Sequence, residues 1–182
     1  MKNTQQEIEL ELAWLVASLP NNLGQCKNIK IVQAYLENSD PHIKDARVRE
    51  KGGVYTYTIK RFAKNSQETG YCTEETREIS REKFLKLSGE SNKKITKTRY
   101  FYPLSQGLTA EIDIYEENLT GLSVVEVEFP NIEAYKQFVP PNWFGKEVSD
   151  SYGIYPPFIA NLSIEEVNAI NQKYLQKPHN FD

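Results

Sequence analysis

Residues 7–14 read EIELELAW, so three glutamates occupy alternate positions and the positions between and after them are apolar. Because successive side chains of a β-strand point to opposite faces, this period of two predicts a strand with one acidic face and one apolar face. The pattern returns at 124–129, which reads VVEVEF. Two such segments far apart in the chain indicate a protein built mainly from half-buried β-strands.

Six further segments show strand patterning: 29–36, 46–49, 54–60, 73–79, 94–102 and 108–115. Gly52 and Gly53 separate two of them, which predicts a tight hairpin. Helices are expected at 80–87, where Ser80 is the N-cap, at 131–138 and at 163–175. The last of these opens with SIEE at 163–166, a capping-box pattern. Residues 63–72 and the Pro- and aromatic-rich stretch that ends near 157 are expected to be loops. About eight strands and three helices, without a repeat or linker, predict one α+β domain over residues 1–182.

Composition excludes several classes of function. The chain has 182 residues with a net charge of −3, so no basic field indicates a nucleic-acid partner. No apolar run approaches the roughly 20 residues of a membrane span, and the polar, acidic first segment is unlike a secretory signal. Cys26 and Cys72 fit no metal-ligand spacing, which predicts reduced thiols. We therefore expect a cytoplasmic protein with no nucleic-acid or membrane partner, either a monomer or a homodimer.

Charged residues of like sign share a strand face. The acidic pairs are Glu9/Glu11, Glu111/Asp113 and Glu126/Glu128, the basic pairs are Arg47/Arg49 and Lys97/Arg99, and Lys60 shares a face with Thr58. A sheet with one solvated face is the simpler explanation, but such a face usually mixes signs and hydroxyl side chains. Eight strands with few helices would also leave apolar faces uncovered unless the sheet curls on itself.

We therefore predict a closed or nearly closed antiparallel eight-stranded β-barrel, with these charges inside and a few helices at its periphery. Like charges crowded in a poorly solvated lumen repel one another unless ligands neutralise them. A polyanion would neutralise the basic side. Carboxylate oxygens favour hard cations such as Mg²⁺ or Mn²⁺ on the acidic side.

A series of motifs, in order along the chain, resembles the CYTH superfamily, which includes triphosphate tunnel metalloenzymes, thiamine triphosphatases and class IV adenylyl cyclases. The motifs are ELELAWLV (9–16) followed by Leu19-Pro20, IVQAYL (31–36), RVR (47–49), TIK (58–60), KTRY (97–100), EIDIY (111–115), VEVEF (125–129) and PNWFGKEV (141–148). The resemblance runs from Glu7 to about Ala160. It implies the tunnel fold and a triphosphate-bearing small molecule as the substrate.

The resemblance also assigns roles to residues. It implies a divalent metal, Mg²⁺ or Mn²⁺, on Glu9, Glu11, Glu126 and Glu128, with Asp113 as a further ligand or orienting group. It implies phosphate contacts from Arg47, Arg49, Lys60, Lys97 and Arg99, and a catalytic role for Glu9, Glu11 and Lys60. Glu111 is expected to be a salt-bridge partner and not a ligand.

Three departures from the family pattern bear on activity. Ala13 stands where the signature has lysine, CTEET at 72–76 keeps one acid in frame and lacks the arginine, and YGIYP at 152–156 replaces a Lys-Arg-Tyr segment. Each lost charge-assisted phosphate contact is worth about 1.5–3 kcal/mol. We therefore expect a triphosphate hydrolase with reduced activity. A non-catalytic polyphosphate-binding relative and a class IV adenylyl cyclase remain the alternatives, although no purine-reading motif is evident.

Overall fold

The computed structural model describes residues 10–62, 72–149 and 156–175, and within them nine strands and four α-helices form. The strands are β1 (Leu10–Val16), β2 (Asn28–Tyr35), β3 (Ile43–Lys51), β4 (Val54–Phe62), β5 (Cys72–Glu78), β6 (Lys93–Pro103), β7 (Thr109–Tyr115), β8 (Ser123–Phe129) and β9 (Phe144–Glu147). The helices are α1 (Arg81–Glu90), α2 (Ile132–Gln137), α3 (Pro156–Ile159) and α4 (Ile164–Leu175). Three single 3₁₀ turns are η1 (Leu23–Gln25), η2 (Ser105–Gly107) and η3 (Glu117–Leu119). None of the described helices is long and apolar enough to cross a membrane.

The strands form one antiparallel sheet in the order β5-β4-β3-β2-β6-β7-β8-β1-β9. The predicted antiparallel α+β class is confirmed. Within the described ranges no hydrogen-bonded pairing joins β5 to β9, so the sheet is not closed by hydrogen bonds and the closed barrel is not confirmed. The ninth strand was not predicted. It has only four residues, too few for a recognisable alternating pattern. It is a strand because it pairs with β1, with Trp14 opposite Glu147 and Val16 opposite Phe144.

The chain divides into two compact units. Of the described residues, 30–62 and 72–96 make the first unit, and 10–29, 97–149 and 156–175 make the second. That residues 1–182 act as one domain stays a prediction.

In the first unit β3 and β4 form the predicted hairpin. Gly52 and Gly53 have φ of 60° and 83°, the left-handed pair that a two-residue turn between twisted strands requires. A substitution by any residue with a Cβ would be strained at both positions. The turn fixes the register of the hairpin, in which Arg47 lies opposite Thr58 and Arg49 opposite Thr56.

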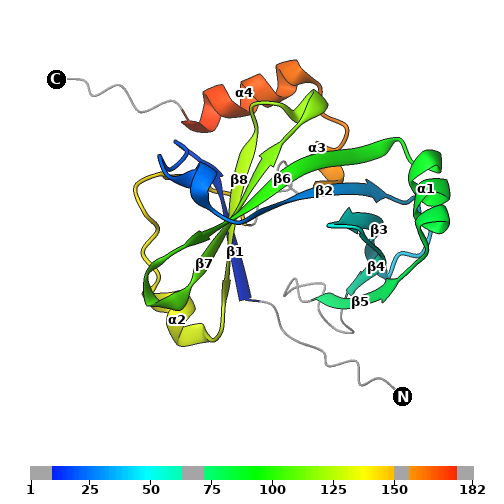
Figure 1. The fold of residues 1–182 in the computed structure, drawn as a ribbon, viewed down its shortest axis with the longest axis horizontal. Helices are drawn as coiled ribbons and strands as arrows, with labels where there is room; N and C mark the ends of the chain where they lie inside the picture. Colours follow the sequence, from blue (N-terminus) through cyan, green and yellow to red (C-terminus); the bar gives the residue numbers. More distant parts are fainter. Residues whose placement is uncertain (1–9, 63–71, 150–155, 176–182) are drawn as a thin grey trace. The chain divides into compact units, whose positions relative to one another are not determined.

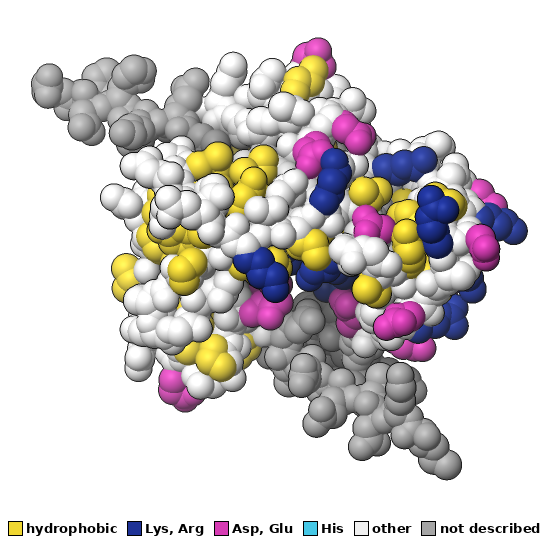
Figure 2. Space-filling view, in the orientation of Figure 1, with side chains coloured by type: hydrophobic (Ala, Val, Ile, Leu, Met, Phe, Trp, Pro, Cys, Tyr) yellow, Lys and Arg dark blue, Asp and Glu magenta, His cyan; other side chains and the backbone are white. Residues whose placement is uncertain are grey.

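Helix α1 packs against β3 and β4 of the first unit (Figure 1). Ser80 caps it as predicted, because its hydroxyl accepts a hydrogen bond from the Lys83 backbone N–H at 3.2 Å. Phe84 is the one fully buried residue of the helix, and it packs into a cluster with Ala34 and Val48. The other side of α1 is solvated, and Figure 2 shows charged side chains of both signs there.

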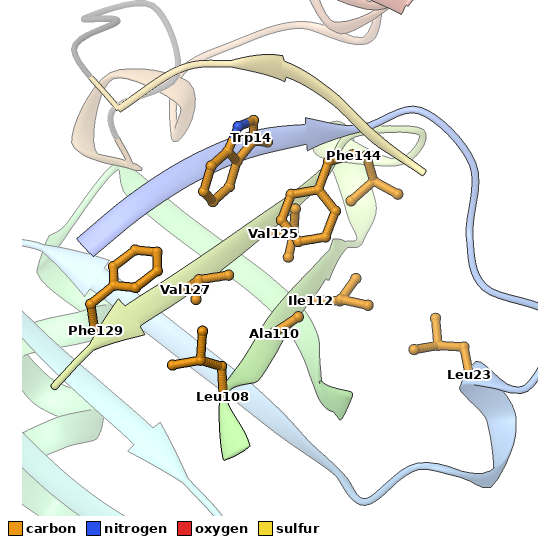
Figure 3. Close-up of a cluster of buried hydrophobic side chains, with 10 residues drawn as sticks. Trp14, Leu23, Leu108, Ala110, Ile112, Val125, Val127, Phe129 and Phe144 are labelled. Atoms are coloured by element: carbon orange, nitrogen blue, oxygen red, sulfur yellow. The ribbon is translucent and has the colours of Figure 1, made fainter. Parts of the chain in front are cut away.

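The apolar faces of β1, β7 and β8 form the core of the second unit. The alternation seen in the sequence puts Trp14 opposite Val125, while Val127 lies opposite Ala110. Figure 3 shows these side chains with Phe129 and others gathered on one side of the strands. Helix α2 and the segment before β9 add aromatic side chains to this cluster. Burying this face leaves the alternate residues of the same strands on the other face.

Helix α4 begins at the predicted capping box. The Ser163 N–H donates to Glu166 Oε2 at 2.8 Å, and the Glu166 N–H donates to Ser163 Oγ at 3.3 Å. Val167 is fully buried on the inner side of this helix, which packs against β1, β9 and η3. Helix α4 thus packs against both strands of the β1–β9 pair.

Candidate functional site

On β1, β6, β7 and β8 the predicted charged site residues lie on the strand face opposite the core shown in Figure 3. Residues directly opposite in an antiparallel pair share a face. Glu11 lies opposite Glu128, Glu126 lies opposite Glu111, and Asp113 lies opposite Arg99. The predicted like-sign pairs on β6, β7 and β8 therefore do share a face. Glu9, the remaining member of the predicted acidic set, lies outside the described residues.

Arg99 is the centre of this face. Its Nε donates to Asp113 Oδ1 and its Nη2 to Asp113 Oδ2, both at 2.6 Å, which is a bidentate contact. Its Nη1 also pairs with Glu111, and its Nη2 with Glu126. Glu111 was predicted to be a salt-bridge partner, and this is confirmed. One guanidinium thus holds three carboxylates from two neighbouring strands.

Lys97 lies two residues before Arg99 and pairs with the same carboxylate, Asp113. Lys97 is 3% exposed and Asp113 is completely buried. A solvated surface position is therefore excluded for both residues. Neither charge could be buried at this depth without the other, because an isolated buried ion costs several kcal/mol.

The protonation of this cluster follows from burial and charge. Burial acts to raise the pKa of Asp113, but the charge of Lys97 and the hydrogen bonds from Arg99 outweigh it, so the pKa is lowered. Burial lowers the pKa of Lys97 despite the attraction of Asp113. Burial opposes the charge of Arg99, but its hydrogen bonds with Asp113 raise its pKa well above the ordinary value. Asp113 is accordingly a carboxylate and Arg99 a cation.

Two pairs of glutamates lie directly opposite each other on this face. Like charges in such positions destabilise a sheet unless a cation lies between them. Arg99 supplies that cation for Glu111 and Glu126. Glu11 and Glu128 form the second pair, and both are exposed. On β1, Glu11 lies two residues before Ala13, which is opposite Glu126.

Carboxylate oxygens on one strand face are the donors that a hard divalent cation prefers, so the chemistry of this set fits such an ion. Among the described residues, however, no group of three or more acidic, histidine or cysteine side chains is already arranged to hold a metal. Both carboxylate oxygens of Asp113 already accept hydrogen bonds from Arg99, and Oδ2 also pairs with Lys97. This geometry favours the orienting role expected for Asp113 over that of a ligand.

The first unit holds the other predicted phosphate-binding residues, and Glu74 of β5 links two of them. Its Oε2 lies 3.2 Å from Lys60 Nζ and 3.4 Å from Arg47 Nη2. Burial acts to raise the pKa of Glu74, but the charges of Arg47 and Lys60 outweigh it and lower the pKa. Arg49 instead donates from Nε to Gln33 Oε1 at 3.3 Å. The three basic side chains are thus held by neighbouring polar groups.

The structure locates one of the three departures from the family pattern on the charged face. Ala13 lies directly opposite Glu126, and its backbone N–H donates to Ser149 Oγ at 3.0 Å. A lysine at this position would lie beside the acidic pairs. Of the segment 152–156, only Pro156 is among the described residues.

Sequence reasoning missed Glu74 and Gln33 as site residues. Glu74 lies directly opposite Lys60, so the pairing of β4 with β5 reveals it, but strand pairing is not visible in local sequence. Gln33 carried a local signal. It is an amide within an apolar strand, and buried amides need hydrogen-bond partners.

Comparison with known proteins agrees with this architecture. No family model matches the chain. An inorganic triphosphatase of Nitrosomonas europaea is 33% identical over 144 residues, which cover 78% of this chain and 89% of that protein. A crystal structure of an inorganic triphosphatase superposes with a TM-score of 0.63 at 31% identity, covering 85% of this chain and 95% of that one. A structure of a hypothetical protein gives a TM-score of 0.64 at 30% identity, covering 85% of this chain and 99% of that one.

An antiparallel sheet with opposed carboxylates and buried cations on one strand face defines a scaffold for binding polyanions and divalent cations. The chain belongs to the CYTH superfamily, together with the inorganic triphosphatase that it resembles.

Proposed function

We propose that this protein is a triphosphatase that hydrolyses inorganic triphosphate with the help of Mg²⁺ or Mn²⁺. The observation that carries the proposal is the face of the second unit, where the buried Lys97 and the partly buried Arg99 lie beside opposed carboxylates. The 33% identity to an inorganic triphosphatase supports the same substrate. Phosphoryl transfer needs positioning and charge stabilisation more than covalent chemistry, and this face offers both.

The basic residues bind the phosphate groups in this proposal. Arg99 can exchange one of its two partly buried glutamates, Glu111 or Glu126, for a phosphate oxygen while Asp113 keeps its bidentate contact. Lys97, held by the same carboxylate, adds a second positive charge. The family resemblance gives a phosphate-binding role to Arg47, Arg49 and Lys60 of the first unit as well, and arginines are suited to bidentate contacts. Lys60 also takes the catalytic role that the family resemblance gives it.

The acidic residues hold the divalent cation. Glu11, Glu126 and Glu128 share one strand face, and Glu9 would precede Glu11 on it by two residues. When bound, such an ion withdraws charge from the phosphates and lowers the pKa of an attacking water. In this proposal these carboxylates would determine the position of the ion. Asp113 orients the side chains of Lys97 and Arg99. Glu9 and Glu11 are the acids that the resemblance also counts as catalytic.

A non-catalytic polyphosphate-binding protein is the second candidate, and Ala13 favours it. In the family a lysine at this position would put a positive charge opposite Glu126. Its absence lowers the expected rate without affecting the strand. Cyclase activity is not favoured, because an inorganic triphosphatase is 33% identical over 78% of this chain.

A phosphate-release assay tests the proposal. Inorganic triphosphate, nucleoside triphosphates and thiamine triphosphate are compared while Mg²⁺ or Mn²⁺ is titrated. We expect release from inorganic triphosphate only with metal, and loss of that activity in Lys97→Met. Lys94→Met, which removes an exposed lysine from the same strand, is the control and should remain active. Metal-dependent binding of triphosphate without release of phosphate would replace the hydrolase with the binding protein.

Two further properties remain predictions. We expect a cytoplasmic protein that is a monomer or a homodimer and that binds neither nucleic acid nor membranes. Light scattering of the purified protein measures the oligomeric state directly.

A further inference from the structure

Gln33 is a polar residue in the most buried part of β2. It is 1% exposed, and its apolar neighbours Ile31 and Ala34 are equally buried. Burying an amide without hydrogen bonds costs about 1–3 kcal/mol, whereas a leucine of similar size would fill the space without that cost. A buried glutamine in such a strand therefore needs a specific reason.

Both ends of the Gln33 amide are bonded. Its Nε2 donates to Tyr35 Oη at 2.7 Å, and its Oε1 accepts from Arg49 Nε at 3.3 Å. A guanidinium has donors only, so the amide oxygen must face Arg49 and the amide nitrogen must face the tyrosine. Tyr35 is itself 3% exposed. The guanidinium thus decides which end of the amide faces it, the tyrosine hydroxyl holds the other end in place, and the amide in turn restrains the arginine.

The strand register supports this connection. Gln33 lies directly opposite Arg49 on β3, and Tyr35 lies directly opposite Arg47. The polar positions of the motif at 31–36 therefore face the two arginines of the motif at 47–49. The polar side chains of both motifs thus lie on the same face of the β2–β3 pair.

We infer that Gln33 and Tyr35 are positioning residues for Arg49, and that they set the edge by which its guanidinium meets a phosphate. Gln33 occupies the Nε–H, so a phosphate oxygen must approach the edge formed by Nη1 and Nη2. An arginine held in this way loses less conformational entropy when it binds. The inference rests on the proposed role of Arg49 in phosphate binding.

The test is a double-mutant cycle measured on inorganic triphosphate with saturating Mn²⁺. Gln33→Leu keeps the volume and removes the acceptor, so we expect KM to rise about tenfold, the effect of losing one well-placed hydrogen bond to a charged group, with little change in kcat. In the Arg49→Ala background the same substitution should change KM by less than twofold. A merely structural role for Gln33 would give equal effects in both backgrounds, and that result would overturn the inference.

Two controls complete the design. Gln172→Leu removes an exposed glutamine of α4 and should leave KM unchanged. If Gln33→Leu does not fold, Tyr35→Phe removes only the hydroxyl that orients the amide and should raise KM in the same direction. An unchanged KM in a folded Tyr35→Phe protein would then count against the inference.

An NMR measurement separates this inference from the proposed function, because it needs no substrate. The Arg49 Nε–H signal should exchange with solvent faster in Tyr35→Phe than in the native protein. Faster exchange in a protein without triphosphatase activity would keep the positioning role and refute the function. Unchanged exchange in an active protein would refute the positioning role alone.

Discussion

Removing the charge of Asp113 is expected to destabilise the protein more than removing any exposed carboxylate. The Asp113→Asn side chain has nearly the same shape, but its amide nitrogen cannot accept from Arg99 or Lys97. Two guanidinium hydrogen bonds and one ammonium contact converge on the native carboxylate, which is completely buried. At least one donor would then face another donor, and the buried Lys97 would lose its counter-charge.

The size of the effect follows from this geometry. Breaking one side of a buried ion pair costs about 3–5 kcal/mol, because the remaining charge stays buried. A domain of this size is stable by only about 5–15 kcal/mol, so the loss is a large part of the total. Asp40 offers the matched control. It pairs with Arg61 at 3.5 Å, but both side chains are more than 40% exposed, and exposed pairs contribute about 0–1 kcal/mol.

Urea unfolding at pH 7 measures both variants. We expect the midpoint to fall strongly for Asp113→Asn and hardly at all for Asp40→Asn, with unchanged slopes. Equal and small losses in the two variants would refute the burial argument. A large loss that is rescued by also changing Lys97 to Met would confirm that the unpaired ammonium is its source.

Three further perturbations test the charged face of the second unit and Glu74 of the first. Ala13→Lys should raise the turnover of inorganic triphosphate about tenfold, equivalent to about 1.4 kcal/mol of barrier, and no gain at all would show that another residue has taken over that role. Mg²⁺ or Mn²⁺ should raise the melting temperature, and Glu126→Gln combined with Glu128→Gln should abolish that shift; an unaltered shift would place the metal elsewhere. The pKa values of Glu74 and Asp113 are lowered in the folded protein, so their contribution to stability is complete above the unfolded values near pH 4 and is lost as the pH falls through the lower folded values. Glu74→Gln should therefore flatten the acid limb of a plot of unfolding free energy against pH, and an identical limb in the variant would contradict this.

Local sequence was sufficient for the parts of the fold that depend on local rules. Alternation gave the strands and their faces, and turn and capping residues gave the hairpin at Gly52-Gly53 and the starts of α1 and α4. The short β9 escaped prediction, because it depends on which strand pairs with which. The same limit applies to the site. The alternation of side chains along the strand placed Glu126 on the correct face. Only the structure shows that Arg99 neutralises its charge.

The ion pairs on the charged face explain how it can fold before it binds anything. Three carboxylates and two cations on neighbouring strands would repel or desolvate one another if they were not matched, yet Arg99 and Lys97 are both paired with them. A divalent cation that binds Glu126 Oε2 must therefore break the bond between Glu126 and Arg99. A phosphate that replaces Glu126 on Arg99 breaks the same bond. Each ligand alone leaves the other partner of that bond without a replacement for it, whereas the two together replace both sides. Binding of metal and of triphosphate should consequently favour each other, since the cost of opening one shared ion pair is met only once.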